Sequence, residues 1–174
     1  MRVWRLAAAA VLWLGLAPAA FAACTGADVL FQDNFDKLQP TWGEPSDVMK
    51  VDNGQLIVTP AADQYFWAPN TANLYDDIDM CVTMTTVTGV SPEDAKAGLI
   101  FWYVDANNFY AFELAPNGKA SVWRRQRGRW LKQVEWQDAK GANAGDGAIN
   151  ELRVTTVGSQ ATFYVNGNEF KDLT

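Results

Sequence analysis

Histidine is absent from the chain, and cysteine occurs only twice, at Cys24 and Cys81. Without imidazole, the sequence excludes histidine-assisted nucleophiles, histidine general bases and the common zinc sites. Two cysteines that pair with each other also leave no thiolate for catalysis. We therefore predict no catalytic residue and no metal site of these classes, and carboxylates remain the candidates for chemistry.

Positively charged residues are fewer than negatively charged ones. Lysine and arginine together number 14 against 20 aspartates and glutamates, which gives a formal net charge of −6. Attraction to nucleic acid and to anionic membranes depends on a positive surface, so this acidic balance argues against both as general partners. Hydrophobic residues make up 49% of the chain, which argues against intrinsic disorder.

The first residues carry a targeting signal. Arg2 and Arg5 flank the start of an apolar stretch from Leu6 to Leu16, and Ala20-Phe21-Ala22 has the small-bulky-small order of a cleavage site. This is the layout of a secretory signal peptide. The stretch is shorter than the roughly 20 residues that cross a bilayer, so no integral membrane segment is expected after cleavage. We predict a signal peptide over 1–22 and a secreted or periplasmic domain over 23–174.

Cys24 allows two interpretations. It follows Phe21-Ala22-Ala23, where a bacterial lipoprotein signal places its lipidated cysteine, although such signals usually have leucine at the position of Phe21. Lipidation would leave Cys81 without a partner. A disulfide between Cys24 and Cys81 accounts for both cysteines of an exported chain, and we favour it over the lipid anchor.

No helical period persists after the leader, and short alternating segments separated by turn residues recur instead. Such a pattern is typical of antiparallel β structure. Hairpin turns such as Asn53-Gly54 and the lack of a crossover helix favour one domain of two packed antiparallel sheets, with a barrel as the second choice. Strands are predicted over 29–35, 48–51, 55–59, 64–68, 78–87, 97–104, 109–114, 120–126, 130–136, 149–157 and 161–165.

The predicted strand over 78–87 alternates cleanly between apolar and polar residues. Because successive side chains of a strand point to opposite faces, Met80, Val82 and Met84 would face the core. Cys81 would then face outward, where an N-terminal tail carrying Cys24 can reach it. The disulfide would clamp the tail over this strand without entering the core.

Several segments resemble bacterial concanavalin A-like domains. They are Leu30-Phe31-Gln32-Asp33-Asn34-Phe35-Asp36 with Trp42, Val51-Asp52-Asn53-Gly54-Gln55-Leu56-Ile57-Val58, Ala97-Gly98-Leu99-Ile100-Phe101, Asn107-Asn108-Phe109-Tyr110-Ala111-Phe112 and Phe163-Tyr164-Val165-Asn166-Gly167. Together they cover most of the exported chain in order. The chain is thus similar to the concanavalin A-like lectin and glucanase superfamily, which includes laminin-G-like and 3-keto-disaccharide hydrolase-like domains.

The resemblance implies a jelly roll of two antiparallel sheets, one of them concave. The shared motifs are turns and core alternation, so they indicate fold more than function. Members of the superfamily continue after the Val-Asn-Gly turn into a last strand, whereas this sequence ends at Thr174. Either that strand is absent, which would expose a sheet edge, or the resemblance is looser.

Acidic residues remain as possible catalysts because glycoside hydrolysis needs only two carboxylates. Glucanases of the superfamily carry Glu-x-Asp-x-x-Glu on one strand, and no segment here matches that pattern. Asp77 and Asp79 have the two-residue spacing without the glutamates, and we interpret them as solvated residues at a strand start. Glu113 lies in an otherwise apolar strand, on the face of Phe109 and Ala111. It either accepts hydrogen bonds from sugar hydroxyls or, as we favour, pairs with a neighbouring arginine.

Aromatic residues offer another route to sugar binding, since the C–H faces of sugars pack on aromatic planes. After the leader, tryptophan occurs at Trp42, Trp67, Trp102, Trp123, Trp130 and Trp136. Most of these rings are expected in the core, and two or three exposed rings would suffice for a site. The predicted ligand-binding residues are Glu113, Trp102, Tyr110, Trp123, Arg125 and Trp130.

Positive residues gather in one hairpin, at Arg124, Arg125, Arg127, Arg129 and Lys132. Such a cluster either contacts an anionic polysaccharide or a lipopolysaccharide phosphate through bidentate bonds, or it is a solvated edge hairpin that charge keeps soluble. Asp105, Asn107 and Asn108 offer the oxygen donors that calcium prefers, but they are also standard turn formers. We expect the turn, and no cofactor.

The sequence therefore predicts an exported, lectin-like and non-catalytic domain whose partner is an oligo- or polysaccharide, neutral or anionic. Two alternatives stay open. One is a glycoside-processing enzyme of the 3-keto-disaccharide hydrolase-like group, which rests on the resemblance, and the other is a structural or adhesive module of the cell envelope. Exposed tryptophans along one sheet would favour a sugar ligand. A flat apolar patch would favour a protein partner, and paired carboxylates in a deep cleft would favour an enzyme.

Overall fold

The computed structural model describes residues 24, 26, 28–85 and 95–174, and this part of the chain is all-β. The predicted leader over 1–22 and the end of the predicted strand 78–87 lie outside the described residues. One short 3-10 helix, η1 (Pro40–Trp42), accompanies the strands. Within the described part, no helix has the length and apolar character that a membrane crossing requires.

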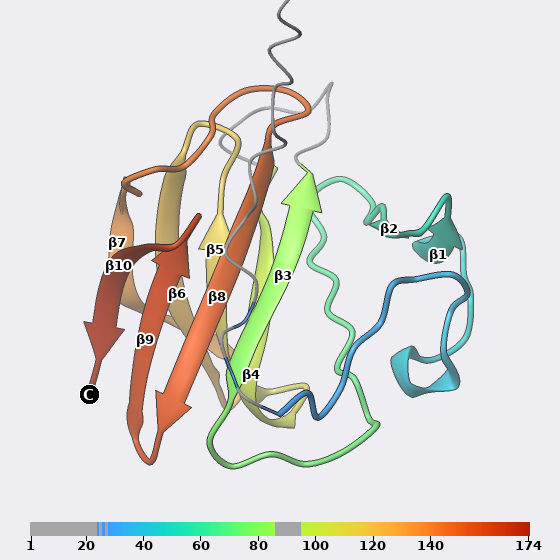
Figure 1. Cartoon of the computed structure of the whole chain (residues 1–174), viewed down its shortest axis with the longest axis horizontal. Coiled ribbons are helices and arrows are strands. Elements are labelled where there is room, and N and C mark those ends of the chain that lie inside the picture. The colour runs from blue at the N-terminus through green and yellow to red at the C-terminus, as the bar shows by residue number, and fades with distance from the viewer. Residues whose placement is uncertain (1–23, 25, 27, 86–94) are drawn as a thin grey trace, which may run out of the picture.

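Two four-stranded antiparallel sheets and one small hairpin hold the strands of the described residues (Figure 1). The hairpin pairs β1 (Met49–Asp52) with β2 (Gln55–Val58). One sheet has the order β10-β9-β8-β3 and the other β4-β5-β6-β7. Their strands are β3 (Asp79–Thr85), β4 (Ala97–Asp105), β5 (Asn108–Leu114), β6 (Lys119–Gln126), β7 (Arg129–Asp138), β8 (Ile149–Val157), β9 (Gln160–Val165) and β10 (Asn168–Leu173).

The two sheets pack face to face around one apolar core. Phe112 of β5 and Phe163 of β9 are fully buried, and their ring centroids lie 5.0 Å apart across the interface. Phe101 of β4 contacts Phe163 in the same way at 5.5 Å. These contacts follow from the period-two pattern, which turns alternate apolar side chains of each strand toward the other sheet. The predicted fold of antiparallel sheets is confirmed.

Tight turns connect neighbouring strands where the sequence places glycine after a residue that tolerates positive φ. Asn53-Gly54 joins β1 to β2 with φ of 51° and 71°, and Asn166-Gly167 joins β9 to β10 with 48° and 74°. Paired positive φ values define the turns whose twist matches antiparallel strands. The Asn166 amide nitrogen also donates to the Gly141 carbonyl at 2.8 Å, so this turn holds the loop that precedes β8.

The predicted disulfide is confirmed, since Cys24 and Cys81 are bonded with their Cα atoms 5.6 Å apart. Cys81 lies on the outer face of β3, while Met80, Val82 and Met84 pack against the core from the inner face. Asp79 lies on the outer face as well, and its carboxylate accepts two hydrogen bonds from Arg153 of β8, at 2.6 and 2.8 Å. Because the Cys24 sulfur is bonded to that of Cys81, it cannot also carry the lipid of the alternative interpretation.

Two predicted strands do not form. In the segment 29–35, Phe35 has a φ of 54° and its backbone N–H donates to the Asp33 carboxylate at 2.8 Å, so the chain turns instead of pairing. The Asp33 carboxylate also accepts a hydrogen bond from the Trp42 indole at 2.9 Å. The segment 64–68 pairs with no strand in the described part of the chain either. An alternating sequence does not by itself provide the hydrogen bonds of a strand. In this segment the alternate residues Tyr65 and Trp67 contact the β4–β7 sheet through their rings.

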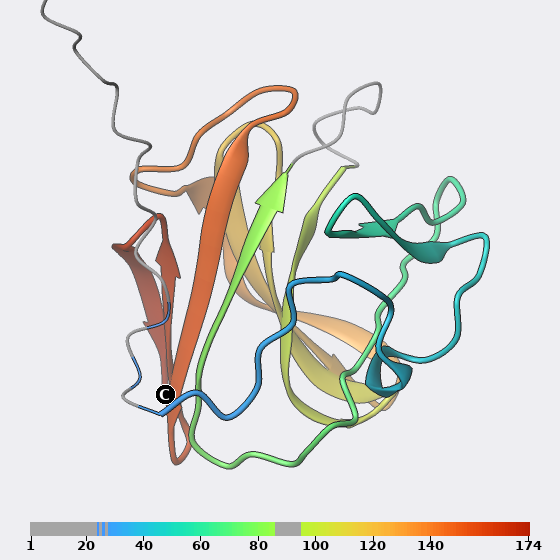
Figure 2. The same ribbon diagram turned by 45° about the vertical axis from the view of Figure 1, so that its right-hand side comes forward.

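One strand was not predicted. β10 follows the Asn166-Gly167 turn and pairs with β9, with a register shift between Glu169 and Lys171. Its alternation is weak in the sequence because Lys171 and Asp172 interrupt it. Phe170 nevertheless stacks on Phe112 of the opposite sheet, with ring centroids 5.8 Å apart. The β1–β2 hairpin and its flanking segments lie beside the two sheets (Figure 2).

Candidate functional site

The outer face of the β4–β7 sheet, which is turned away from the core, gathers aromatic and charged side chains. Strand register places Phe109 opposite Arg125, Ala111 opposite Trp123 and Glu113 opposite Ser121, all on this face. On β7, Trp130 pairs with Arg125 and Lys132 with Trp123. The expected sharing of one face by Phe109, Ala111 and Glu113 is confirmed.

A segment far from β5 in the sequence covers part of this face. Trp67 lies 5.3 Å from the Phe109 ring, and Tyr65 lies 5.7 Å from the Trp130 ring. Trp130 in turn meets Phe109 edge to face at 5.5 Å. Phe109 is only 2% exposed as a result, although it points away from the core.

Cations lie over the rings of the same face. The Arg125 guanidinium is 5.0 Å from the Trp67 centroid and 5.2 Å from that of Trp130. These distances are within the range of cation–π attraction. We call the whole set the aromatic–cation layer. It comprises Tyr65, Trp67, Trp123, Trp130 and Trp136 with Lys96, Arg125 and Lys132, where Lys132 lies 5.5 Å from Trp123 and Lys96 lies 5.8 and 5.9 Å from Tyr65 and Trp136.

Hydrogen bonds fix several members of the layer. The Trp123 indole donates to the Ser121 hydroxyl at 2.9 Å, and the Arg125 Nε donates to the Ala106 carbonyl at 3.0 Å. Lys132 forms an ion pair with Glu135 at 2.9 Å. The Trp123 ring and the Arg125 and Lys132 cations are thus each fixed by a polar contact.

Glu113 lies within this face, between Gly98 of β4 and Ser121 of β6. Burial raises the pKa of Glu113 from its ordinary 4.5 to about 7, and the charge of Lys96 opposes that rise. The expected pairing with an arginine is wrong. Among the described residues, no ion pair includes Glu113, and Lys96 is the cation that acts on it.

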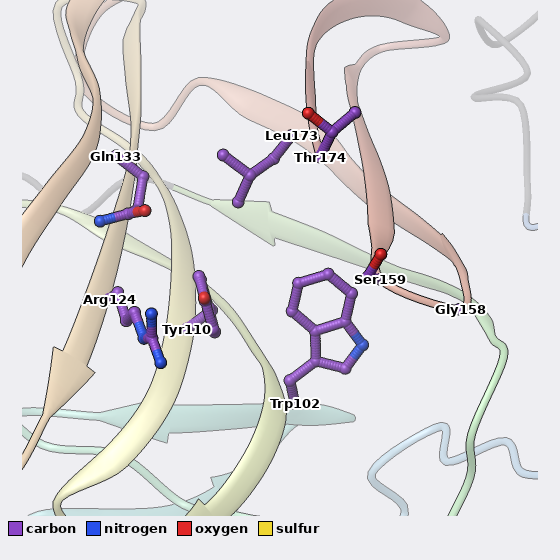
Figure 3. A pocket seen from close by; sticks show the side chains of 8 residues that line it. All are labelled: Trp102, Tyr110, Arg124, Gln133, Gly158, Ser159, Leu173 and Thr174. Carbon is purple, nitrogen blue, oxygen red and sulfur yellow. The ribbon is translucent and has the colours of Figure 1, made fainter.

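The predicted site residues divide between two places. Glu113, Trp123, Arg125 and Trp130 lie together on the outer face, as described above. Trp102 and Tyr110 lie on the other side of the sheet, packed against the core side of Phe101 and lining a cleft between the two sheets (Figure 3). A register shift between Phe101 and Asp105 breaks the alternation of β4 and keeps Trp102 on the core side, so Trp102 does not join the outer-face residues.

The arginine hairpin is divided in the same way. Arg125 joins the outer layer, whereas Arg124 faces the inner side, where its guanidinium lies 5.2 Å from the Tyr110 ring. Arg127 occupies the turn with Gly128, at φ values of 50° and 75°, and it is exposed, as is Arg129. A second hollow is lined by Gln126, Arg127, Arg129 and Leu131. Arg124 and Arg125, which are consecutive on β6, therefore point to opposite faces of the sheet, and the arginines of the hairpin do not form one patch.

The predicted site residues do not include five members of the layer, namely Tyr65, Trp67, Trp136, Lys96 and Lys132. Tyr65 and Trp67 lie in a segment whose alternation predicts a strand, and Lys96 precedes β4 without any motif around it. The one available signal was the alternation of Tyr65 and Trp67, which puts both rings on one side of the chain. No spacing in the sequence connects that segment with β7.

The other candidates have structural partners. Asp77 accepts a hydrogen bond from the Gly158 N–H at 2.7 Å. Asp79 pairs with Arg153 on the opposite sheet from Glu113 and its side chain is largely covered, so the expectation that Asp79 is solvated is wrong. The Asp105 carboxylate accepts hydrogen bonds from the Asn107 N–H and the Asn108 amide, at 2.7 and 2.9 Å, as a turn former does. Within the described ranges, no cluster of three or more acidic or cysteine ligands is placed to hold a metal.

Comparisons with protein-family models, with curated proteins and with solved structures gave no match to this chain.

Proposed function

We propose that this protein is a carbohydrate-binding, lectin-like domain, and that the aromatic–cation layer on the outer face of the β4–β7 sheet is its binding surface. The observation that carries the proposal is the interleaving of partly exposed rings with cations around Glu113. Sugars present C–H faces to aromatic planes and hydroxyls to charged groups, so one face of this kind meets both requirements.

Partial exposure of the rings supports the proposal. Tyr65 is 56% exposed, and Trp123, Trp130 and Trp136 are each partly exposed. Rings that served only to fill the interior would be fully covered, as Phe112 is. Indole and phenol rings also lose little conformational entropy when a ligand orders them.

Glu113 adds a polar group suited to hydroxyls. With a pKa of about 7, its carboxyl group exists in both protonation states near neutral pH, so it either donates or accepts a hydrogen bond. Among the described residues, the charge acting on it is that of Lys96 and not that of a second carboxylate. Glycoside hydrolysis by the usual route needs two carboxyl groups about 5 to 10 Å apart, so this arrangement favours binding.

We also propose a concanavalin A-like jelly roll and an exported location for this protein. Two antiparallel sheets with the orders β10-β9-β8-β3 and β4-β5-β6-β7 are compatible with a concanavalin A-like jelly roll. A disulfide between Cys24 and Cys81 suits an oxidising compartment, which supports an exported protein, secreted or periplasmic. We propose both on these grounds.

Binding of neutral and acidic polysaccharides to the purified protein, measured by isothermal titration calorimetry, tests the proposal. Trp123→Ala and Trp136→Ala should each weaken the best ligand by about 10-fold or more, because each removes a stacking surface. Trp42→Ala is the matched control, since Trp42 packs on Phe31 and Phe35 of the N-terminal segment. Folded protein that binds nothing across a broad panel would contradict the proposal.

A glycoside-processing enzyme is the second candidate, and the elevated pKa of Glu113 is the observation that favours it, since general acids are tuned in this way. Glu113→Gln separates the two. Loss of turnover on a disaccharide substrate with retained folding would favour the enzyme, whereas retained sugar binding without any turnover in the unaltered protein would favour the lectin.

A further inference from the structure

A cleft of about 500 Å³ opens between the two sheets, on the core side of β4–β7 and so on the opposite side from the aromatic–cation layer. Each strand of that sheet contributes one lining residue, namely Trp102, Tyr110, Arg124 and Gln133. The β8–β9 turn contributes Ser159, and the end of β10 contributes Leu173. Figure 3 shows these side chains around a common space. Ligand sites in proteins typically occupy about 300–1,000 Å³, so the cleft has the size of a small-molecule site.

Trp102 is directed into this cleft by an irregular backbone. Its φ is 45°, a value that bulky residues adopt at a cost in energy and that tends to occur at functional sites. The register shift that follows Phe101 keeps Trp102 on the core side, where regular alternation would have turned it outward. Its ring meets Tyr110 edge to face at 5.2 Å. One side of the Trp102 ring packs against Phe101 at the edge of the core, and the partly buried ring also lines the cleft.

Arg124 supplies the charge of the cleft. Its guanidinium lies 5.2 Å from the Tyr110 ring, and none of the ion pairs among the described residues includes it. A guanidinium presents paired N–H donors that match the two oxygens of a carboxylate.

The remaining lining residues complete the recognition of a sugar acid. The Trp102 indole offers a plane to one face of a pyranose ring, while the Ser159 hydroxyl and the Gln133 amide offer both donors and acceptors to ring hydroxyls. A carboxylate without a ring would not use the Trp102 plane, and a neutral sugar would not use the charge of Arg124.

We propose that this cleft is a second binding site and that it takes a uronic acid, a pyranose bearing one carboxylate, with Arg124 on the carboxylate and Trp102 on the ring. The site does not depend on the outer-face layer, because the two lie on opposite sides of one sheet and share no residue.

Titration calorimetry of the purified protein with glucuronate tests the proposal, with glucose, methyl glucuronate ester and acetate as comparison ligands. Glucuronate should bind at least about 10-fold more tightly than each of the three, since each lacks either the charge or the ring. Arg124→Gln and Trp102→Phe should each weaken glucuronate, the first by about 10-fold or more. Circular dichroism checks that both variants fold.

Control variants distinguish this site from the outer face. Arg129→Gln removes an exposed arginine of the same hairpin and should leave glucuronate affinity unchanged. The proposal is overturned if glucuronate does not bind, if acetate binds equally well, or if binding survives in folded Arg124→Gln protein. Loss of glucuronate binding in Trp123→Ala but not in Arg124→Gln would also overturn it and would assign the acid to the outer face.

Discussion

The Arg125 guanidinium lies 5.0 Å from the ring of Trp67, and this contact joins the segment around Trp67 to the outer face of the β4–β7 sheet. The same guanidinium lies over Trp130 and bonds the Ala106 carbonyl through Nε. One side chain therefore ties together an irregular segment, a strand and a turn. The organisation of the aromatic–cation layer depends on such shared contacts, because no strand of the described residues pairs with the segment around Trp67.

Arg125→Ala should lower the free energy of unfolding by about 1–2 kcal/mol, since it removes two cation–π contacts and one hydrogen bond. Urea denaturation followed by circular dichroism measures the change. Arg129→Ala, at an exposed position of the same hairpin, is the control and should stay within about 0.5 kcal/mol of the unaltered protein. Equal stabilities for the two variants would show that Arg125 does not organise this face.

The stability of the protein should depend on pH through Glu113. Its folded-state pKa of about 7 lies above the ordinary 4.5, so the folded state holds a proton that the unfolded chain releases between these values. The contribution of the protonated group is fully present below pH 4.5 and is lost as pH rises through 7. A pKa displacement of this size corresponds to about 3 kcal/mol between the protonation states.

Glu113→Gln should remove this dependence. The variant should match the unaltered protein in stability near pH 4.5 and exceed it near pH 8 by up to about 3 kcal/mol. Glu135→Gln is the control, because the Glu135 side chain is 75% exposed. Parallel pH profiles for Glu113→Gln and the unaltered protein would refute the buried, proton-binding state of this carboxyl group.

The disulfide should contribute strongly to stability because it closes a long loop. Cys24 and Cys81 are 57 positions apart, and removing a crosslink over such a span typically costs about 2–4 kcal/mol. The double variant Cys24→Ser/Cys81→Ser should therefore denature at a clearly lower temperature than the unaltered protein. Reductant should lower the melting temperature of the unaltered protein and leave that of the double variant unchanged. A reductant effect on both would assign the change to something other than this bond.

Gly98 should resist substitution because of the strand beside it. A Cβ at this position would overlap the carbonyl oxygen of Phe112 on β5, so Gly98→Ala forces β4 and β5 apart. The expected loss exceeds about 2 kcal/mol in the free energy of unfolding. Gly26→Ala is the matched control, since a Cβ there meets its nearest atom at an ordinary 3.9 Å. Similar costs for the two substitutions would contradict the close approach of β5 to Gly98.

Local chemistry explains which features were predictable from the sequence. Asn53-Gly54 specifies its turn through two residues that tolerate positive φ, and the alternation around Cys81 fixes the face on which the disulfide forms. Glu113 was placed correctly with Phe109 and Ala111 for the same reason, because β5 keeps its alternation throughout. Such features depend on residues close together in the sequence, so a single sequence is enough to predict them.

The errors arose where the backbone departs from a regular period or where distant segments meet. Trp102 follows Phe101 directly, so alternation assigns it to the outer face, but the bulge turns it inward. Tyr65 and Trp67 alternate like strand residues although their rings, not their backbone, contact the sheet. Lys96 reaches Tyr65 and Trp136 only because the fold brings three separate segments together, and no spacing in the chain encodes that.

Nitrogen-15 labelling of the tryptophan indoles gives the most direct measurement of the proposed sugar site, since each indole N–H reports its own surroundings. Addition of the polysaccharide that binds best should shift the signals of Trp123, Trp130 and Trp136, and leave the signal of Trp42 in place. Assignment follows from single tryptophan-to-phenylalanine variants. If bound sugar instead leaves all three outer-face signals unmoved, carbohydrate recognition does not occur on the aromatic–cation layer.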